Sequence, residues 1–260
     1  MYPFELEAAC VCLVGREGNN EDNFFFDGRC LQAGNNGLHH AVVMSKSLQR
    51  EVCFAVFDGI GEMDFGEAAA FAAVQKMQTV MQQLDSYCIP EKTFLQDTCR
   101  KLHEEVLREK SARGTDRMGV SMGALFFSQN YVYMCSVGDV RTYRLRGGEF
   151  LQLSKAHGVK EEGGKPGIPA RYLGMDTAGE PLKPYIAKGE LRGGDKYLIC
   201  SDGLTSMLTN LEIDDVLLRF TDLGICAKEL ADKALSKGGQ KNVTVIVIDV
   251  MSGASAAGRH

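Results

Sequence analysis

The sequence contains little that would direct the protein to a nucleic acid or a membrane. Its 29 Lys and Arg residues are outnumbered by 34 Asp and Glu, and they form no basic stripe. Because a phosphate backbone is bound by clustered Lys and Arg, we expect no nucleic-acid partner. The longest apolar run is far shorter than the ~20 residues that span a bilayer, and the sequence does not begin with a basic segment followed by an apolar one. We therefore expect a cytoplasmic protein that does not bind membranes.

The sequence also has no Cys-x-x-Cys pair, although it contains nine cysteines. Several of them, including Cys10, Cys53 and Cys200, lie in apolar, strand-like runs. This pattern is typical of reduced, buried thiols, and it favours them over disulfides or a zinc site. The length of 260 residues suits a single domain built on two sheets. We assign residues 1–251 to that domain and expect residues 252–260 to be a disordered tail.

What the sequence does contain is a set of acids placed at the ends of apolar strands. An isolated Asp-Gly there is usually a turn that hydrogen-bonds its own backbone. Here the pattern recurs, and the ends of separate strands can converge on one point, where clustered carboxylates bind Mg²⁺ or Mn²⁺. The positions are Glu21-Asp22 before the strand Phe24–Phe26, Asp58-Gly59 after Val52–Phe57, Asp139 after Tyr131–Val137, and Asp202-Gly203 after Lys196–Cys200.

The order and spacing of these segments resemble the metal-dependent protein phosphatase family (PPM, the type 2C serine/threonine phosphatases), and its bacterial members in particular. The resemblance extends from about residue 6 to residue 250. It implies an α+β fold, a four-layer α-β-β-α sandwich in which two antiparallel sheets lie face to face between helix pairs. The segments that carry it are Gly15-Arg16, Asn20–Asp22, Phe54–Gly61, Gly66–Ala68, Met118-Gly119, Gly138–Arg141, Leu173-Gly174, Cys200–Thr205, Gly238-Gly239 and Asn242–Val247.

The resemblance also implies a chemistry. Two divalent cations, Mn²⁺ or Mg²⁺, would lie in a cleft between the sheets and activate a bridging hydroxide that attacks the phosphorus of phosphoserine or phosphothreonine in line. Position by position, Asp58 would bridge the two metals, the Gly59 carbonyl would bind the second, and Asp202 would bind the first. Glu21 and Asp22 would hold metal-bound waters.

Two further residues receive roles in the same way. Asp139 matches the acid of an accessory third metal. Arg16 matches the arginine whose guanidinium binds the substrate phosphate. The family has three residues between this arginine and its acid pair and this sequence has four, so a solvated loop arginine is the alternative.

The sequence departs from the family pattern at two metal-site positions. The family closes with Gly-Gly-x-Asp-Asn-Val-Thr, and Lys241 stands where that aspartate is a ligand of the first metal; Ser206 replaces an acid of the third site. An ammonium about 5 Å from a divalent ion would repel it by roughly 6 to 7 kcal/mol at an effective dielectric constant of 20. Either the Lys241 stem turns into solvent, or its ammonium replaces the cation and pairs with Asp58 and Asp202.

Two functional hypotheses follow. The first is a serine/threonine phosphoprotein phosphatase with a diverged metal centre, acting as a monomer on a phosphoprotein such as the substrate of a cognate serine/threonine kinase. The retained acids favour it. The second is a pseudophosphatase that binds a phosphopeptide or partner without hydrolysing it, and Lys241 and Ser206 favour that alternative.

Periodicity along the chain predicts the remaining elements. Apolar residues at three- and four-residue steps predict helices over 64–84, with Asp64 as the N-cap, and over 90–110. Short connections at 128–130 and 147–148 predict β-hairpins. Residues 155–184 lack periodicity and match the family's flap beside the active site, and His39-His40 fall in a loop or edge strand without a role. Strands are further expected over 5–14, 185–191, 196–201 and 242–250, and helices over 204–220 and 225–237.

Overall fold

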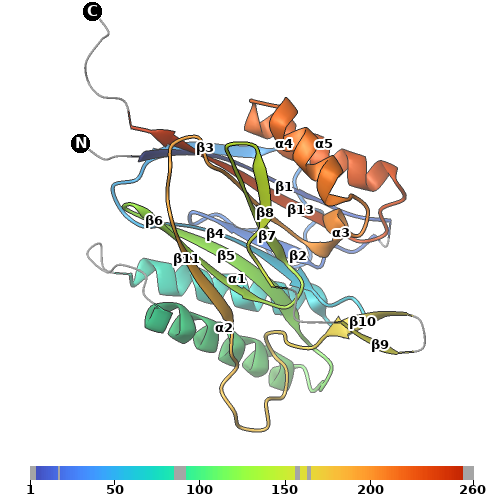
Figure 1. Cartoon of the computed structure of the whole chain (residues 1–260). Helices are drawn as coiled ribbons and strands as arrows, with labels where there is room; N and C mark the ends of the chain where they lie inside the picture. Colours follow the sequence, from blue (N-terminus) through green and yellow to red (C-terminus); the bar gives the residue numbers. More distant parts are fainter. Residues whose placement is uncertain (1–3, 17, 85–91, 156–158, 163–164, 254–260) are drawn as a thin grey trace, which may run out of the picture.

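The computed structural model describes residues 4–16, 18–84, 92–155, 159–162 and 165–253. Its centre is a stack of two antiparallel sheets (Figure 1). The six-stranded sheet has the order β3 (Val42–Ser47), β1 (Phe4–Leu13), β13 (Val243–Ser252), β12 (Lys196–Cys200), β7 (Arg141–Arg146), β8 (Glu149–Gln152). The five-stranded sheet has the order β11 (Tyr185–Glu190), β6 (Tyr131–Val137), β5 (Val120–Ser128), β4 (Val52–Gly59), β2 (Asp22–Phe26).

Helices cover the outer face of each sheet (Figure 1). The five-stranded sheet packs against α1 (Gly66–Gln82) and α2 (Lys92–Ala112). The six-stranded sheet packs against α3 (Asp202–Thr205), α4 (Asn210–Arg219) and α5 (Leu223–Ser236). This arrangement confirms the expected α-β-β-α sandwich.

Three apolar layers hold these elements together. Alternate residues of the central strands point to opposite faces, so each strand contributes to two layers. In β4, Phe54 and Val56 pack between the sheets, while Ala55 and Phe57 pack under α1 and α2. All four are fully buried, which explains why this strand reads as a continuous apolar run.

Most predicted elements have the expected type. The hairpins β5–β6 and β7–β8 form as predicted. β6 and β7 follow one another in the chain but belong to different sheets, so Gly138 and its neighbours carry the chain from one sheet to the other. The 155–184 segment, whose sequence lacks periodicity, contains a small ribbon of β9 (Val159–Glu162) and β10 (Lys165–Pro169).

One capping prediction is wrong. Asp64 does not cap α1: the N-cap is Phe65, which has a left-handed backbone (φ 56°) and makes no side-chain capping bond. Asp64 instead accepts a hydrogen bond from the Thr115 hydroxyl, at 2.6 Å. His39 and His40 lie in a bend just before the edge strand β3. The tail predicted from residue 252 begins too early, because Ser252 is the last residue of β13. The rest of that tail beyond residue 253, and the start of the second predicted helix, 90–91, lie outside the described residues.

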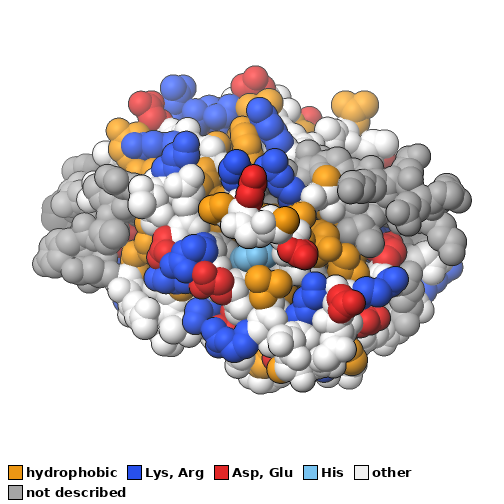
Figure 2. Space-filling model, turned by 90° about the horizontal axis from the view of Figure 1, so that it is seen from below, with side chains coloured by type: hydrophobic (Ala, Val, Ile, Leu, Met, Phe, Trp, Pro, Cys, Tyr) orange, Lys and Arg blue, Asp and Glu red, His pale blue; other side chains and the backbone are white. Residues whose placement is uncertain are grey.

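The surface mixes basic and acidic side chains (Figure 2), as the nearly balanced numbers of the two in the sequence predict. Figure 2, which shows the underside of the view in Figure 1, has Lys and Arg side chains spread among Asp and Glu. In the described part of the chain, no helix is long and apolar enough to cross a membrane. The eight cysteines there are free thiols, and all but Cys30 are buried.

Candidate active site

The acids at the strand ends converge at one end of the sandwich. Asp22 and Asp58 are register partners in the antiparallel pair β2–β4. Oδ2 of Asp58 accepts a hydrogen bond from the backbone N–H of Asp202, at 3.1 Å. Because Asp202 follows β12 in the other sheet, this bond joins residues 144 positions apart and connects the two sheets. The structure therefore brings Asp22, Asp58 and Asp202 together.

A close backbone approach positions the Asp58 end of β4. The N–H of Gly59 donates to the Glu21 carbonyl, at 3.1 Å. A Cβ on Gly59 would lie 2.6 Å from the Gly66 carbonyl oxygen and 2.8 Å from that of Glu21. Only glycine therefore fits here, and its absence of a side chain lets β4, the Glu21 strand entry and the start of α1 pack in contact.

A cavity of about 290 Å³ opens beside these residues. Charged side chains and backbone atoms line it, in contrast to the apolar residues that fill the layers of the sandwich. The lining residues are Glu21, Asp22, Asp58, Gly59, Gly61, Glu62, Lys241 and Asn242.

Lys241 forms an ion pair in this site. Its Nζ lies 2.7 Å from Oδ2 of Asp202, and the side chains of the two residues are 36% and 22% exposed. Burial alone would lower the pKa of Lys241, but the charges of Asp202, Asp58 and Glu62 outweigh it and raise that pKa. Of the two orientations considered for Lys241, the structure has the one in which the ammonium pairs with Asp202.

Negative charge nevertheless exceeds positive charge around Asp58. Burial raises the pKa of Asp58 well above its usual value, and the nearby Asp202 and Asp22 carboxylates raise it further. Burial also raises the pKa of Asp22 to about 6, against hydrogen bonds from Thr244 and Ser201 that favour its charged form. Uncompensated carboxylates of this kind are stabilised by a bound cation.

In the part of the chain that the structure describes, the carboxylates at this site do not form a complete set of metal ligands. Among the described residues, no group of three or more His, Cys, Asp or Glu side chains is arranged to hold a metal ion. Asp202, which the resemblance assigns to the first metal, already pairs with Lys241. Asp58 and the Gly59 backbone line the cavity, so an ion there would take their oxygens and complete its shell with water, as Mg²⁺ commonly does; Asp22, which also lines the cavity, would hold one of those waters.

Asp139 lies near the site but outside the cavity lining. Its Oδ1 lies 3.8 Å from Nε of Arg141, and its backbone N–H donates to Oγ of Ser121. Burial raises the pKa of Asp139, while Arg141 acts in the opposite direction. Ser206 lies in an exposed position just after α3, and its hydroxyl points to the Gly203 carbonyl at 3.5 Å.

Arg16 lies on an exposed turn next to the segment that carries Lys241. Its backbone N–H donates to the Gly239 carbonyl, at 3.2 Å. Its side chain is not part of the cavity lining. The structure therefore brings the Arg16 backbone close to the site, and the guanidinium would have to turn inward to reach a phosphate in the cavity.

Two residues that support the site carried no predicted role. The Thr244 hydroxyl donates to Oδ2 of Asp22, at 2.6 Å. The Asn242 side chain accepts from the Gly15 N–H at 3.0 Å and donates to the Asn19 carbonyl at 2.9 Å. The sequence feature that could have identified both residues is their polarity next to the apolar segment Val245–Val247. A polar side chain buried there requires a hydrogen-bond partner.

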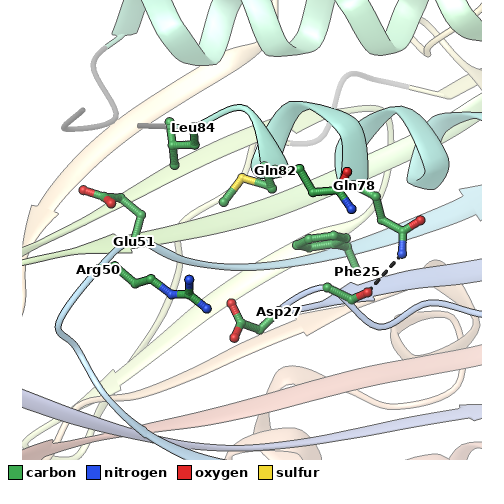
Figure 3. A pocket seen from close by; sticks show the side chains of 9 residues that line it. Phe25, Asp27, Arg50, Glu51, Gln78, Gln82 and Leu84 are labelled. Carbon is green, nitrogen blue, oxygen red and sulfur yellow. Dashed lines mark hydrogen bonds between the residues drawn. The ribbon is translucent and has the colours of Figure 1, made fainter. Parts of the chain in front are cut away.

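A larger cavity, of about 410 Å³, lies at the opposite end of β2 and β4 (Figure 3). Phe25 forms its floor, and Asp27, Arg50 and Glu51 surround it together with Gln78, whose amide donates to the Gly28 carbonyl. It shares no lining residue with the cavity at Asp58. Size alone therefore does not identify the site where the acids gather.

Known proteins that resemble this chain in sequence include protein phosphatases. The sequence pattern of the family described as Protein phosphatase 2C matches residues 39–237. Serine/threonine phosphatase Stp of Listeria monocytogenes is 28% identical over 211 residues, which cover 75% of this chain and 82% of that protein. Serine/threonine protein phosphatase PstP of Mycobacterium tuberculosis is 34% identical over 144 residues, 52% of this chain and 28% of that protein.

Solved structures share the fold. PppA, a regulatory component of the type VI secretion system (T6SS) in Pseudomonas aeruginosa, has a TM-score of 0.74 at 24% identity, over 95% of this chain and 98% of that one. The catalytic domain of PstP in complex with two manganese ions has a TM-score of 0.72 at 24% identity, over 96% and 100%. The family match includes Asp58, Asp139 and Asp202 and ends before Lys241.

Proposed function

The chain belongs to the protein phosphatase 2C family, and from this premise we propose that it hydrolyses phosphoserine and phosphothreonine in proteins with the help of Mn²⁺ or Mg²⁺. The observation that carries the proposal is the contact between Asp58 and Asp202 across the two sheets: the backbone N–H of Asp202 donates to Oδ2 of Asp58, at 3.1 Å. Relatives such as Stp, named as serine/threonine phosphatases, support the substrate class.

The residues divide the work as follows. Asp58 and the Gly59 carbonyl would hold the metal, and Glu21 and Asp22 would hold waters on it. When bound, such an ion supplies an acidified water and neutralises charge on the phosphoryl group. Lys241 would contribute a fixed positive charge at the Asp202 side, where the resemblance to the family implies the first metal.

Arg16 and Asp139 lie outside the cavity lining and would have supporting roles. Arg16 would bind the substrate phosphate after turning its guanidinium into the cavity. Asp139 would serve an accessory metal, which requires release from Arg141. Residues 1–251 would act as one monomeric phosphatase domain in the cytoplasm, opposing a serine/threonine kinase.

The test is hydrolysis of an aryl phosphate and of a phosphothreonine peptide at millimolar Mn²⁺. We expect turnover that requires Mn²⁺ and disappears in Asp58→Asn, because that change removes a carboxylate from the proposed metal site. Asp232→Asn, an exposed change on α5, is the matched control and should retain activity. Absence of turnover by well-folded protein would exclude the phosphatase.

The Lys241–Asp202 ion pair favours a second candidate, a regulatory domain that binds a phosphopeptide or partner without hydrolysing it. Under this alternative Lys241→Asp would restore a metal ligand and create activity that the parent lacks. Strong hydrolysis by the unaltered protein would rule out this candidate.

A further inference from the structure

A separate cavity of about 270 Å³ lies between the two sheets, at the edge formed by β8 and β11. Its floor consists of Leu125, Val132 and Met134 from the five-stranded sheet and Tyr197 from the other. Each of these side chains is at most 5% exposed. The cavity therefore reaches into the apolar layer between the sheets, and it shares no lining residue with the cavity at Asp58.

Small residues on the edge strand create this space. Ala187 and Gly189 of β11 line the cavity, where a larger residue would fill it. A Cβ added to Gly189 would contact only Val132, at 3.6 Å, an ordinary van der Waals distance. Strand edges are usually closed by packing, so an open edge with small residues leaves room for a ligand.

Arg144 of β7 brings a positive charge into this apolar space. Its neighbours Tyr143 and Leu145 pack under the helices of the six-stranded sheet, so Arg144 projects from the opposite face, toward the other sheet. Its Nε is buried and has no hydrogen-bond partner among the residues that the structure describes. An unpaired buried N–H of a guanidinium costs free energy that an acceptor would recover.

No described residue at the cavity accepts a hydrogen bond from this Nε–H group. The nearest ion-pair partner of Arg144 is Glu149, at 3.6 Å, and the Glu149 side chain is 69% exposed. Among the described residues that line the cavity, none is an Asp or Glu. Lys188 also lines it, but its ammonium lies over the Tyr131 ring at 3.8 Å. The cavity thus combines an apolar floor with one unsatisfied cationic donor.

We propose that this cavity binds a small amphipathic carboxylate, with its head on Arg144 and its hydrocarbon tail between the sheets. A carboxylate can accept side by side from Nε and a terminal nitrogen of one guanidinium. The volume lies just below the ~300–1,000 Å³ of ordinary ligand pockets, which suits a tail of several carbons rather than a long-chain lipid. The proposal does not depend on whether the protein is a phosphatase.

Titration calorimetry with octanoate tests the assignment, with 1-octanol as the uncharged ligand of equal length. We expect saturable binding of one octanoate per chain, at least about tenfold tighter than binding of octanol, since a charge-assisted bidentate pair adds to tail burial. Arg144→Met should remove that preference for octanoate. Ala187→Phe should abolish binding of both ligands by filling the cavity.

The control is Arg192→Met, which removes the same charge from an exposed position and should bind octanoate as the parent does. Equal binding of octanol and octanoate by the unaltered protein would overturn the proposal. So would unchanged octanoate binding in Ala187→Phe, or no binding up to about 10 mM. The ligand comparison in the unaltered protein and the Ala187→Phe result decide the matter even if Arg144→Met fails to fold.

Discussion

The Lys241 ammonium lies 2.7 Å from the Asp202 carboxylate, and the Asp58 carboxylate accepts the Asp202 N–H at 3.1 Å. Asp202 therefore faces a protein-borne cation on one side and a second acid on the other. If divalent ions bind among these acids, as the resemblance to the phosphatase family implies, the lysine would supply permanently part of the charge that a metal supplies reversibly. This relationship makes the affinity for divalent ions the most informative quantity to measure.

Lys241→Ala should raise the affinity for Mn²⁺. At about 5 Å the repulsion between an ammonium and a divalent ion would reach roughly 6 to 7 kcal/mol at a dielectric constant of 20. The Lys241 side chain is 36% exposed, so solvent screening reduces that figure, and we expect a gain of about tenfold to a hundredfold. Calorimetry with MnCl₂ measures it, with Lys237→Ala as a matched surface control. Equal affinity in Lys241→Ala and the unaltered protein would show that the lysine does not oppose the metal.

Asp58→Asn should stabilise the metal-free protein. Asp58 carries its charge among Asp22 and Asp202, and burial disfavours that charge. Asparagine keeps an oxygen that can accept the Asp202 N–H and removes the repulsion, so the free energy of unfolding should rise by about 1–2 kcal/mol. Urea unfolding in EDTA measures this, with Asp232→Asn as the comparison. A loss of stability would mean that Lys241 already compensates the Asp58 charge fully.

The four-layer fold was expected from the resemblance to the phosphatase family, and the meeting of the acids from the pattern of the strands. Apolar strands that end in carboxylates indicate buried sheets with a polar end, so the sequence predicts that Asp58 and Asp202 can converge. The direction of a long side chain has no such local signal. Two orientations were open for Lys241, and Arg16 was either a ligand of the substrate phosphate or a solvated loop arginine; its side chain lies outside the cavity lining.

Local rules failed where tertiary contacts decide. Asp64 has the residue type of a helix cap, but its carboxylate bonds to Thr115, 51 residues away, and the exposed Phe65 begins α1 instead. No periodicity could indicate the empty space at Ala187 and Gly189 either, because it arises from the packing of two sheets. Sequence patterns therefore predicted layers and clusters, and the structure was needed for pairings and voids.

His103 should make the stability depend on pH. Its Nδ1 accepts the backbone N–H of Gly174 at 3.1 Å, and burial lowers the pKa of His103 below its usual value. The unfolded chain then binds a proton more readily, so the stabilisation is complete above about pH 6.5 and declines as pH falls toward the lower folded pKa. Urea unfolding at pH 7.5 and 5.5 should show a larger loss in the unaltered protein than in His103→Gln.

His103→Gln also separates the contribution of the hydrogen bond to Gly174 from that of protonation of the imidazole. Glutamine can accept from Gly174 but does not titrate, so at pH 7.5 its cost should be at most about 1 kcal/mol. An identical pH dependence in both proteins would assign the effect to other groups.

Gly59→Ala should destabilise the protein by about 2 kcal/mol or more. The new Cβ would lie 2.6 Å from the Gly66 carbonyl oxygen and 2.8 Å from that of Glu21, and both contacts are with backbone, which cannot turn away as a side chain can. Gly189→Ala is the matched control, because its Cβ meets only Val132 at 3.6 Å and β11 is an edge strand. The free energies of unfolding of the two variants, measured with urea, should therefore differ by most of the predicted ~2 kcal/mol. If both lost equal stability, the close approach of β4 to α1 would not be what holds Asp58 at the site.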